Sequence, residues 1–135
     1  TPCNIVKFTD HAKKLDVDVN YQFINDLELN LEETFDITFI DTWHIYGQLI
    51  RELNKFHSIT NKYMILHDTE VDKYSGESIR CNSNIQQQSL DSGYPVHEIK
   101  CGLEKAINEF LLNNPNWIIE KRYTNNNGLT ILKKI

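Results

Sequence analysis

The chain has 135 residues, a formal net charge of −5, 40% hydrophobic residues and 24% charged residues, which is typical of one globular domain spanning residues 1–135. The acidic balance argues against a nucleic-acid partner, which needs clustered Lys and Arg, and the apolar runs fall short of the roughly 20 residues that span a bilayer, so no membrane partner is expected. Cys3, Cys81 and Cys101 are widely spaced and show no metal-binding motif, which favours reduced thiols and a cytoplasmic location.

The N-terminal part of the sequence predicts one helix and one short strand. Apolar residues recur at helical spacing from Cys3 to Leu15. The run Tyr21–Ile24 is aromatic and β-branched, which is typical of a strand. The chain opens at Thr1 without a Met and already looks like the inside of a domain, so we expect a processed or truncated domain.

A strand–helix–strand unit is predicted next, beginning with an apolar strand at Asp36–Asp41. One face of the following helix is apolar, with Ile45, Leu49, Ile50, Leu53 and Phe56. The opposite face is expected to contact water, with Gln48, Arg51, Glu52 and Lys55. The second strand, Tyr63–Leu66, lacks polar alternation, as expected of a strand covered on both faces. Two strands joined by a helix favour a parallel pair.

The segment 69–97 shows no sustained periodicity, apart from a weak helix signal at Asn84–Leu90. Loops longer than about 12–15 residues are uncommon and are often lids, so a lid and a surface insertion both remain open. A second amphipathic helix runs from Ile99 and ends before Pro115. A β-hairpin closes the chain, with Trp117–Tyr123 and Leu129–Leu132 as strands and Asn125–Gly128 as the turn.

Groups that can do chemistry gather where the two central strands end. Asp41 and His44 follow the first strand, and His67 and Asp68 follow the second. Because the carboxyl ends of parallel strands meet at one edge of a sheet, we expect all four on one rim. Three interpretations remain open: a divalent metal site on the two aspartates, acid–base catalysis by a histidine, or capping and packing alone. Trp43, inside this cluster, either packs or stacks on a ligand.

Other catalytic patterns are not found in the sequence. There is no GxSxG nucleophile motif and no HExxH zinc motif, and neither Cys81 nor Cys101 is next to a histidine. No two glycines are separated by one residue. The glycine-rich turn that lets a backbone approach a nucleotide cofactor is therefore not in this chain.

Five ordered segments carry a family resemblance: FIDTWHIYGQL, YMILHDTE, GLEKAINEFL, NPNW and TNNNGLTIL. They resemble the C-terminal half of class I S-adenosylmethionine-dependent methyltransferases, and more narrowly the cephalosporin-hydroxylase and sugar O-methyltransferase group. The resemblance covers Tyr21 to the end. It implies an α/β, three-layer Rossmann-like fold with a mainly parallel sheet and an antiparallel C-terminal hairpin. The first strands and the glycine-rich turn of that family have no counterpart here.

The resemblance also implies a function, methyl transfer from S-adenosylmethionine to a small hydroxylated acceptor such as a sugar. By the same resemblance, Asp26 would hold the adenine amine, while Asp41 and His44 would face the methionine part of the cofactor or a metal. Asp41 and Asp68 would bind Mg²⁺ or a similar ion. His44 or His67 would take the proton of the acceptor. His67 departs from the acidic residue that some relatives have at this position.

Two other functions are consistent with the sequence. A non-catalytic remnant of the fold would expose a sheet edge and would work as an interaction module, forming a homo-oligomer through that edge. A metal-dependent hydrolase could use the same carboxylates, and activity without S-adenosylmethionine would distinguish it.

Overall fold

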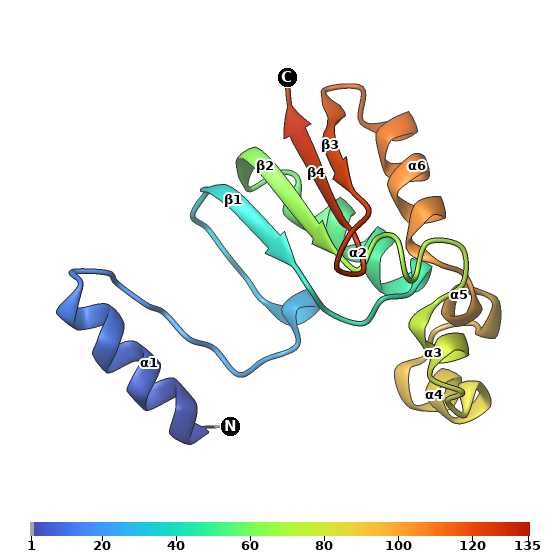
Figure 1. Ribbon diagram of the computed structural model, residues 1–135, viewed down its shortest axis with the longest axis horizontal. Helices are drawn as coiled ribbons and strands as arrows, with labels where there is room; N and C mark the ends of the chain where they lie inside the picture. The colour runs from blue at the N-terminus through green and yellow to red at the C-terminus, as the bar shows by residue number, and fades with distance from the viewer. Residues whose placement is uncertain (1) are drawn as a thin grey trace.

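The computed structural model describes residues 2–135, and their side chains from residue 4 onwards, as an α/β chain (Figure 1). Its helices are α1 (Pro2–Lys14), α2 (Tyr46–Phe56), α3 (Glu77–Arg80), α4 (Ile85–Ser92), α5 (Val96–Lys100) and α6 (Leu103–Asn113), with a 3₁₀ turn η1 (Asp26–Glu28). Its strands are β1 (Phe35–Ile40), β2 (Thr60–His67), β3 (Trp117–Tyr123) and β4 (Leu129–Lys134). Within the described residues, the helices are too short or too polar to cross a membrane.

The four strands form one mixed sheet in the order β1-β2-β4-β3. The strands β1 and β2 are parallel, as the strand–helix–strand pattern predicts, and β4 pairs antiparallel with both β2 and β3. The expectation of a mainly parallel sheet is therefore wrong, since only one of the pairings is parallel. The reason is that the terminal hairpin, rather than a helix-linked strand, supplies the neighbour of β2.

The core lies on one face of the sheet, under α2 and α6 (Figure 1). Met64 and Leu66 of β2 point into this core and are buried, together with residues of both helices. The expectation that β2 is covered on both faces is wrong, because Tyr63 and Ile65 on the opposite face are only half-buried. Among residues 2–135 no helix layer covers that second face, so the expected three layers are not formed.

The N-terminal segment lies apart from the sheet (Figure 1). The helix predicted there is confirmed as α1, whereas Thr1 lies outside the described residues. The strand predicted at Tyr21–Ile24 is wrong: these residues pair with no strand within the described chain, and Phe23 is 95% exposed. A strand needs a neighbour to satisfy its backbone groups, and its sequence alone does not provide one.

The segment 69–97 contains α3 and α4, and α5 begins within it. The weak helix signal at Asn84–Leu90 is confirmed by α4, but the helix expected from Ile99 is divided into α5 and α6. The division falls at Gly102, where an added Cβ would lie 2.5 Å from the backbone oxygens of Asp72 and Lys73. Glycine therefore lets the start of α6 lie directly against the segment that follows β2.

The terminal hairpin forms as predicted, with β3 and β4 antiparallel. Its turn contains three residues with positive φ, Asn126, Asn127 and Gly128, as its sequence indicates. The backbone oxygen of Asn127 accepts hydrogen bonds from the amides of Glu70 and Val71 at 2.9 Å. The turn thus holds the chain just after the end of β2.

Candidate metal and acid–base site

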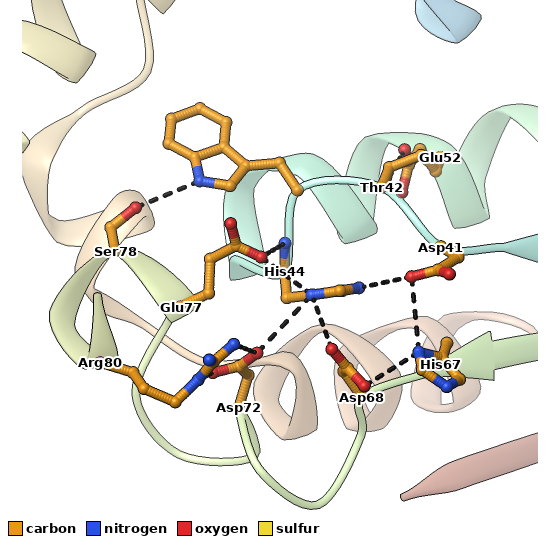
Figure 2. A network of polar contacts seen from close by, with 11 residues as sticks. Asp41, Thr42, His44, Glu52, His67, Asp68, Asp72, Glu77, Ser78 and Arg80 are labelled. Carbon is orange, nitrogen blue, oxygen red and sulfur yellow. Dashed lines mark hydrogen bonds and ion pairs between the residues drawn. The ribbon is translucent and has the colours of Figure 1, made fainter. Parts of the chain in front are cut away.

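The four residues predicted to meet at the strand ends do meet there (Figure 2). Asp41 follows β1, His67 is the last residue of β2, and His44 and Asp68 follow shortly after the two strands. The Oδ1 atom of Asp41 lies 3.1 Å from His44 Nε2 and 3.4 Å from His67 Nδ1. The rim cluster, which we define as Asp41, His44, His67 and Asp68, is therefore a feature of the folded chain.

Two atoms of the rim cluster are close together and yet unsatisfied. His67 Nδ1 lies 2.9 Å from Asp68 Oδ1, but both atoms are buried and neither has a hydrogen-bond partner among the described residues. The Asp68 residue is only 8% exposed. Its backbone adopts a φ of 55°, a left-handed conformation that Asp tolerates better than most residues. Buried polar atoms normally have partners, so a ligand bound at this pair would satisfy both atoms.

Three further residues of the site come from the segment after β2 and were not expected from the sequence. They are Asp72, Glu77 and Arg80. On its Nδ1 side, His44 faces Glu77 Oε2 at 2.8 Å, Asp68 Oδ2 at 3.3 Å and Asp72 Oδ2 at 3.6 Å. The only sequence signal was a helical spacing of acidic and basic residues, with Asp72 four residues after Asp68 and Arg80 three after Glu77.

Arg80 neutralises one of these carboxylates. Its Nε and one terminal nitrogen each donate to Asp72 at 2.8 Å, in a two-pronged pair. Asp72 is fully buried, and its hydrogen bonds raise the pKa of the Arg80 guanidinium above its ordinary value. Asp72 is thus held as the partner of Arg80, while Asp41, Asp68 and Glu77 leave an acidic site around two imidazoles. Such a charge distribution favours a bound cation.

Among the described residues, two overlapping sets of side chains have the spacing for a metal ion. Asp41, His44 and His67 make one set, and His44, Asp68 and Asp72 make the other. In the second set Asp72 is already engaged by Arg80. The first set lies at the open rim, where the side chain of Asp41 is 47% exposed and that of His67 is 33% exposed. The first set is therefore better suited than the second set to a ligand that exchanges with solvent.

A second polar network lies behind the rim, on α2. Glu52 is fully buried, and its Oε1 accepts hydrogen bonds from Thr42 at 2.6 Å and from Gln48 at 2.7 Å. Burial, with Asp26 nearby, raises the pKa of Glu52 to about 8. The expectation that Gln48 and Glu52 face water is wrong, because η1 and the hydroxyl of Tyr94 cover this side of the helix.

Asp26 and Trp43 lie outside the rim cluster. Asp26 is in η1 and accepts a hydrogen bond from Gln48 at 3.3 Å. It does line one cleft of about 410 Å³ together with Asp41 and Thr42, between η1 and β1. Trp43 donates through Nε1 to Ser78 at 3.1 Å and stacks on Tyr94, with ring centroids 5.9 Å apart. The Trp43 ring therefore packs the segment after β2 against the site.

No protein-family model, curated protein or solved structure matches this chain.

Proposed function

We propose that this chain acts as a metal-dependent S-adenosylmethionine methyltransferase on a hydroxyl group of a small acceptor, such as a sugar. The observation that carries this proposal is the rim cluster, in which carboxylates and imidazoles converge at the ends of two parallel strands. The parallel pair followed by an antiparallel hairpin is also consistent with the resemblance described above.

We assign the metal to Asp41 Oδ1 and His67 Nδ1 of the set at the open rim, with Asp68 Oδ1, 2.9 Å from His67 Nδ1, as a further ligand. The last two atoms are buried without hydrogen-bond partners in the described chain, and Asp41 Oδ1 lies 3.4 Å from His67 Nδ1. A set with two carboxylates and one imidazole suits Mn²⁺ and other first-row divalent ions, and His67 makes it less selective for Mg²⁺. A bound ion would orient the acceptor and lower the pKa of its hydroxyl.

His44 is the residue best placed to take the proton of the acceptor. Its Nε2 lies 3.1 Å from Asp41 Oδ1, so a hydroxyl held beside Asp41 is within reach of this nitrogen. Histidine is suited to this task because its ordinary pKa lies near neutrality. The two histidines then have different roles, with His67 binding the ion and His44 acting as the base.

The cofactor would lie in the cleft between η1 and β1. Its lining combines the carboxylates of Asp26 and Asp41 with apolar side chains that include Leu29 and Leu31. This combination suits an adenosine, with an apolar wall for the base and an acceptor for its amine. Trp43 and His44 do not line the cleft, so we assign cofactor binding to Asp26 and Asp41 among the residues expected from the sequence.

Titration of the purified chain with S-adenosylhomocysteine in a calorimeter, with and without Mn²⁺, tests the proposal. We expect micromolar binding that Asp26→Ala weakens at least about tenfold, because the hydrogen bond from the adenine amine to the carboxylate is lost. Asp18→Ala, at an exposed position, is the matched control. No binding of the cofactor product with or without the ion would contradict the proposal for this chain.

A second candidate function is an interaction module, and the free edge of β1 favours it. Within the described residues β1 has a neighbour on one side only, and Phe35, Ile37 and Phe39 project from it with 38%, 54% and 57% exposure. The other edge strand, β3, is protected by charged side chains, whereas β1 offers an apolar edge. A second copy of this chain could pair with β1 around a two-fold axis and join the two apolar faces.

A further inference from the structure

We propose that Gln48 is a positioning residue that fixes the carboxylate of Asp26 in the cleft between η1 and β1, and that it thereby sets the preference of this cleft for a 6-aminopurine. The inference rests on the proposed function, which places the adenosine of the cofactor in this cleft. It assigns a role to a buried glutamine of α2 that does not itself line the cleft.

Gln48 joins three separate parts of the chain. It lies on α2 and is only 9% exposed. Its Nε2 donates to Asp26 Oδ1 in η1 at 3.3 Å, and to Glu52 Oε1, one turn further along α2, at 2.7 Å. Its Oε1 accepts a hydrogen bond from the hydroxyl of Tyr94 at 2.8 Å. Both ends of the buried amide are therefore engaged.

Tyr94 decides which way the amide of Gln48 points. The Tyr94 ring is itself held by two neighbours: it stacks on Trp43 with ring centroids 5.9 Å apart, and the guanidinium carbon of Arg51 lies 4.3 Å from its centroid. A glutamine amide has one end that accepts hydrogen bonds and one end that donates them. With its oxygen at the Tyr94 hydroxyl, its nitrogen faces Asp26.

The side chain of Asp26 depends on this amide for its direction. Asp26 lies in a short 3₁₀ turn that contains no buried residue. Among the described residues, Gln48 is the one that donates a hydrogen bond to the Asp26 carboxylate. A binding group keeps its geometry when a second side chain, itself locked by packing and hydrogen bonds, supports it. Gln48 supplies that support from behind the cleft.

The direction of the Asp26 carboxylate matters because purines differ at position 6. The amine of adenine donates a hydrogen bond to a carboxylate, whereas the 6-oxo group of hypoxanthine is an acceptor and is repelled by it. A site built for a hydrogen bond rejects an analogue that cannot make it, because a polar group is then left unpaired. An Asp26 side chain free to turn away from the base loses this discrimination.

Three-bond couplings between the α and β hydrogens of Asp26 test the positioning in the chain without cofactor or metal. A side chain held in one staggered rotamer gives the couplings of that rotamer, and one that rotates gives averaged couplings. We expect one rotamer in the wild type and averaged couplings in Gln48→Ala. The matched control is Gln87→Ala, which removes an exposed glutamine that donates to Asp91 and should leave the Asp26 couplings unchanged.

Calorimetric titration with S-adenosylhomocysteine and S-inosylhomocysteine tests the specificity. We expect the wild type to bind the adenosyl compound at least about tenfold more tightly, and Gln48→Ala to reduce this ratio to about threefold or less. A general structural effect would change both affinities by the same factor. Tyr94→Phe, which removes the hydroxyl that orients the amide, should lower the ratio in the same direction. If Gln48→Ala does not fold, Gln48→Met, which keeps the volume and removes the donor, takes its place.

Any of three results would overturn the inference: averaged couplings in the wild type, couplings that the loss of the Gln48 amide leaves unchanged, or an equal ratio of affinities with and without that amide. The couplings need no cofactor. A wild-type chain that binds neither compound would therefore contradict the proposed function, and the couplings would still decide whether Gln48 positions Asp26.

Discussion

Glu52 couples the stability of the chain to pH, because it is buried on α2 among groups that do not neutralise it. Its pKa is raised from 4.5 to about 8, mainly by burial. The folded chain therefore keeps the Glu52 proton up to about pH 8, whereas the unfolded chain releases it near pH 4.5. The stability that Glu52 contributes is complete below the lower value and is lost as pH rises through the upper one.

We predict that the free energy of unfolding falls between about pH 5 and pH 8 and that Glu52→Gln flattens this dependence, since an amide cannot release a proton. Urea unfolding at several pH values measures it. Glu120→Gln, at an exposed glutamate, should leave the slope unchanged. A slope that is the same with and without the Glu52 carboxyl would contradict the raised pKa.

At the scale of single residues, the sequence could place the rim cluster but not its surroundings. Asp41, His44, His67 and Asp68 follow recognisable strands, and parallel strand ends converge for general reasons. Glu52 falls on the polar side of its helix, and its burial depends on η1 and Tyr94, which cover that side through contacts with Gln48. The contacts of Glu77 and Arg80 depend on the path that the segment after β2 takes to return to the site. The sequence of that segment has no sustained periodicity that would predict this path.

At the scale of elements, the hairpin turn keeps the end of β2 in place. Gly128 has a φ of 98°, and an added Cβ would lie 2.4 Å from the backbone nitrogen of Glu70. Gly93, at the end of α4, has a φ of 75° with nothing within 4 Å of an added Cβ. Both glycines have a left-handed backbone, but only Gly128 is crowded. A comparison of their alanine variants therefore separates backbone strain from steric overlap.

We predict that Gly93→Ala costs about 1 kcal/mol in free energy of unfolding, from backbone strain alone. Gly128→Ala should cost about 1–3 kcal/mol more, because the added methyl group overlaps the backbone that follows β2. Chemical denaturation of both variants gives the difference. Equal losses for the two variants would show that the turn does not press on Glu70.

The elements that the sequence predicted well are those whose stability is local or whose partner follows closely. The helices α2 and α6 have a continuous apolar face, and the hairpin carries its own turn residues. The predicted strand at Tyr21–Ile24 fails because pairing is a property of the whole sheet. The expectation of mainly parallel strands fails for the same reason, since the second neighbour of β2 is β4, from the end of the chain.

At the scale of the whole molecule, the sheet has one covered and one open face. Ile37 on β1 and Ile118 on β3 lie in the same row across the open face. Ile37 is paired with Tyr63, Tyr63 with Lys133, and Lys133 with Ile118. If the apolar edge of β1 pairs with a second copy, we predict a dimer by light scattering that Ile37→Lys converts to a monomer. Ile118→Lys, on the charged edge, should leave the dimer intact. A wild-type monomer would contradict this pairing.

Binding of a divalent cation by the rim cluster, as we propose, can be measured by titration with Mn²⁺ followed by electron paramagnetic resonance of the free ion. We predict one site per chain, weakened at least about tenfold by Asp68→Asn, since even outer-shell changes weaken metal sites by that factor. Glu70→Gln, in the same loop and outside the cluster, should bind as the wild type does. A wild-type chain that leaves all Mn²⁺ free, or an Asp68→Asn chain that binds it equally well, would contradict the claim.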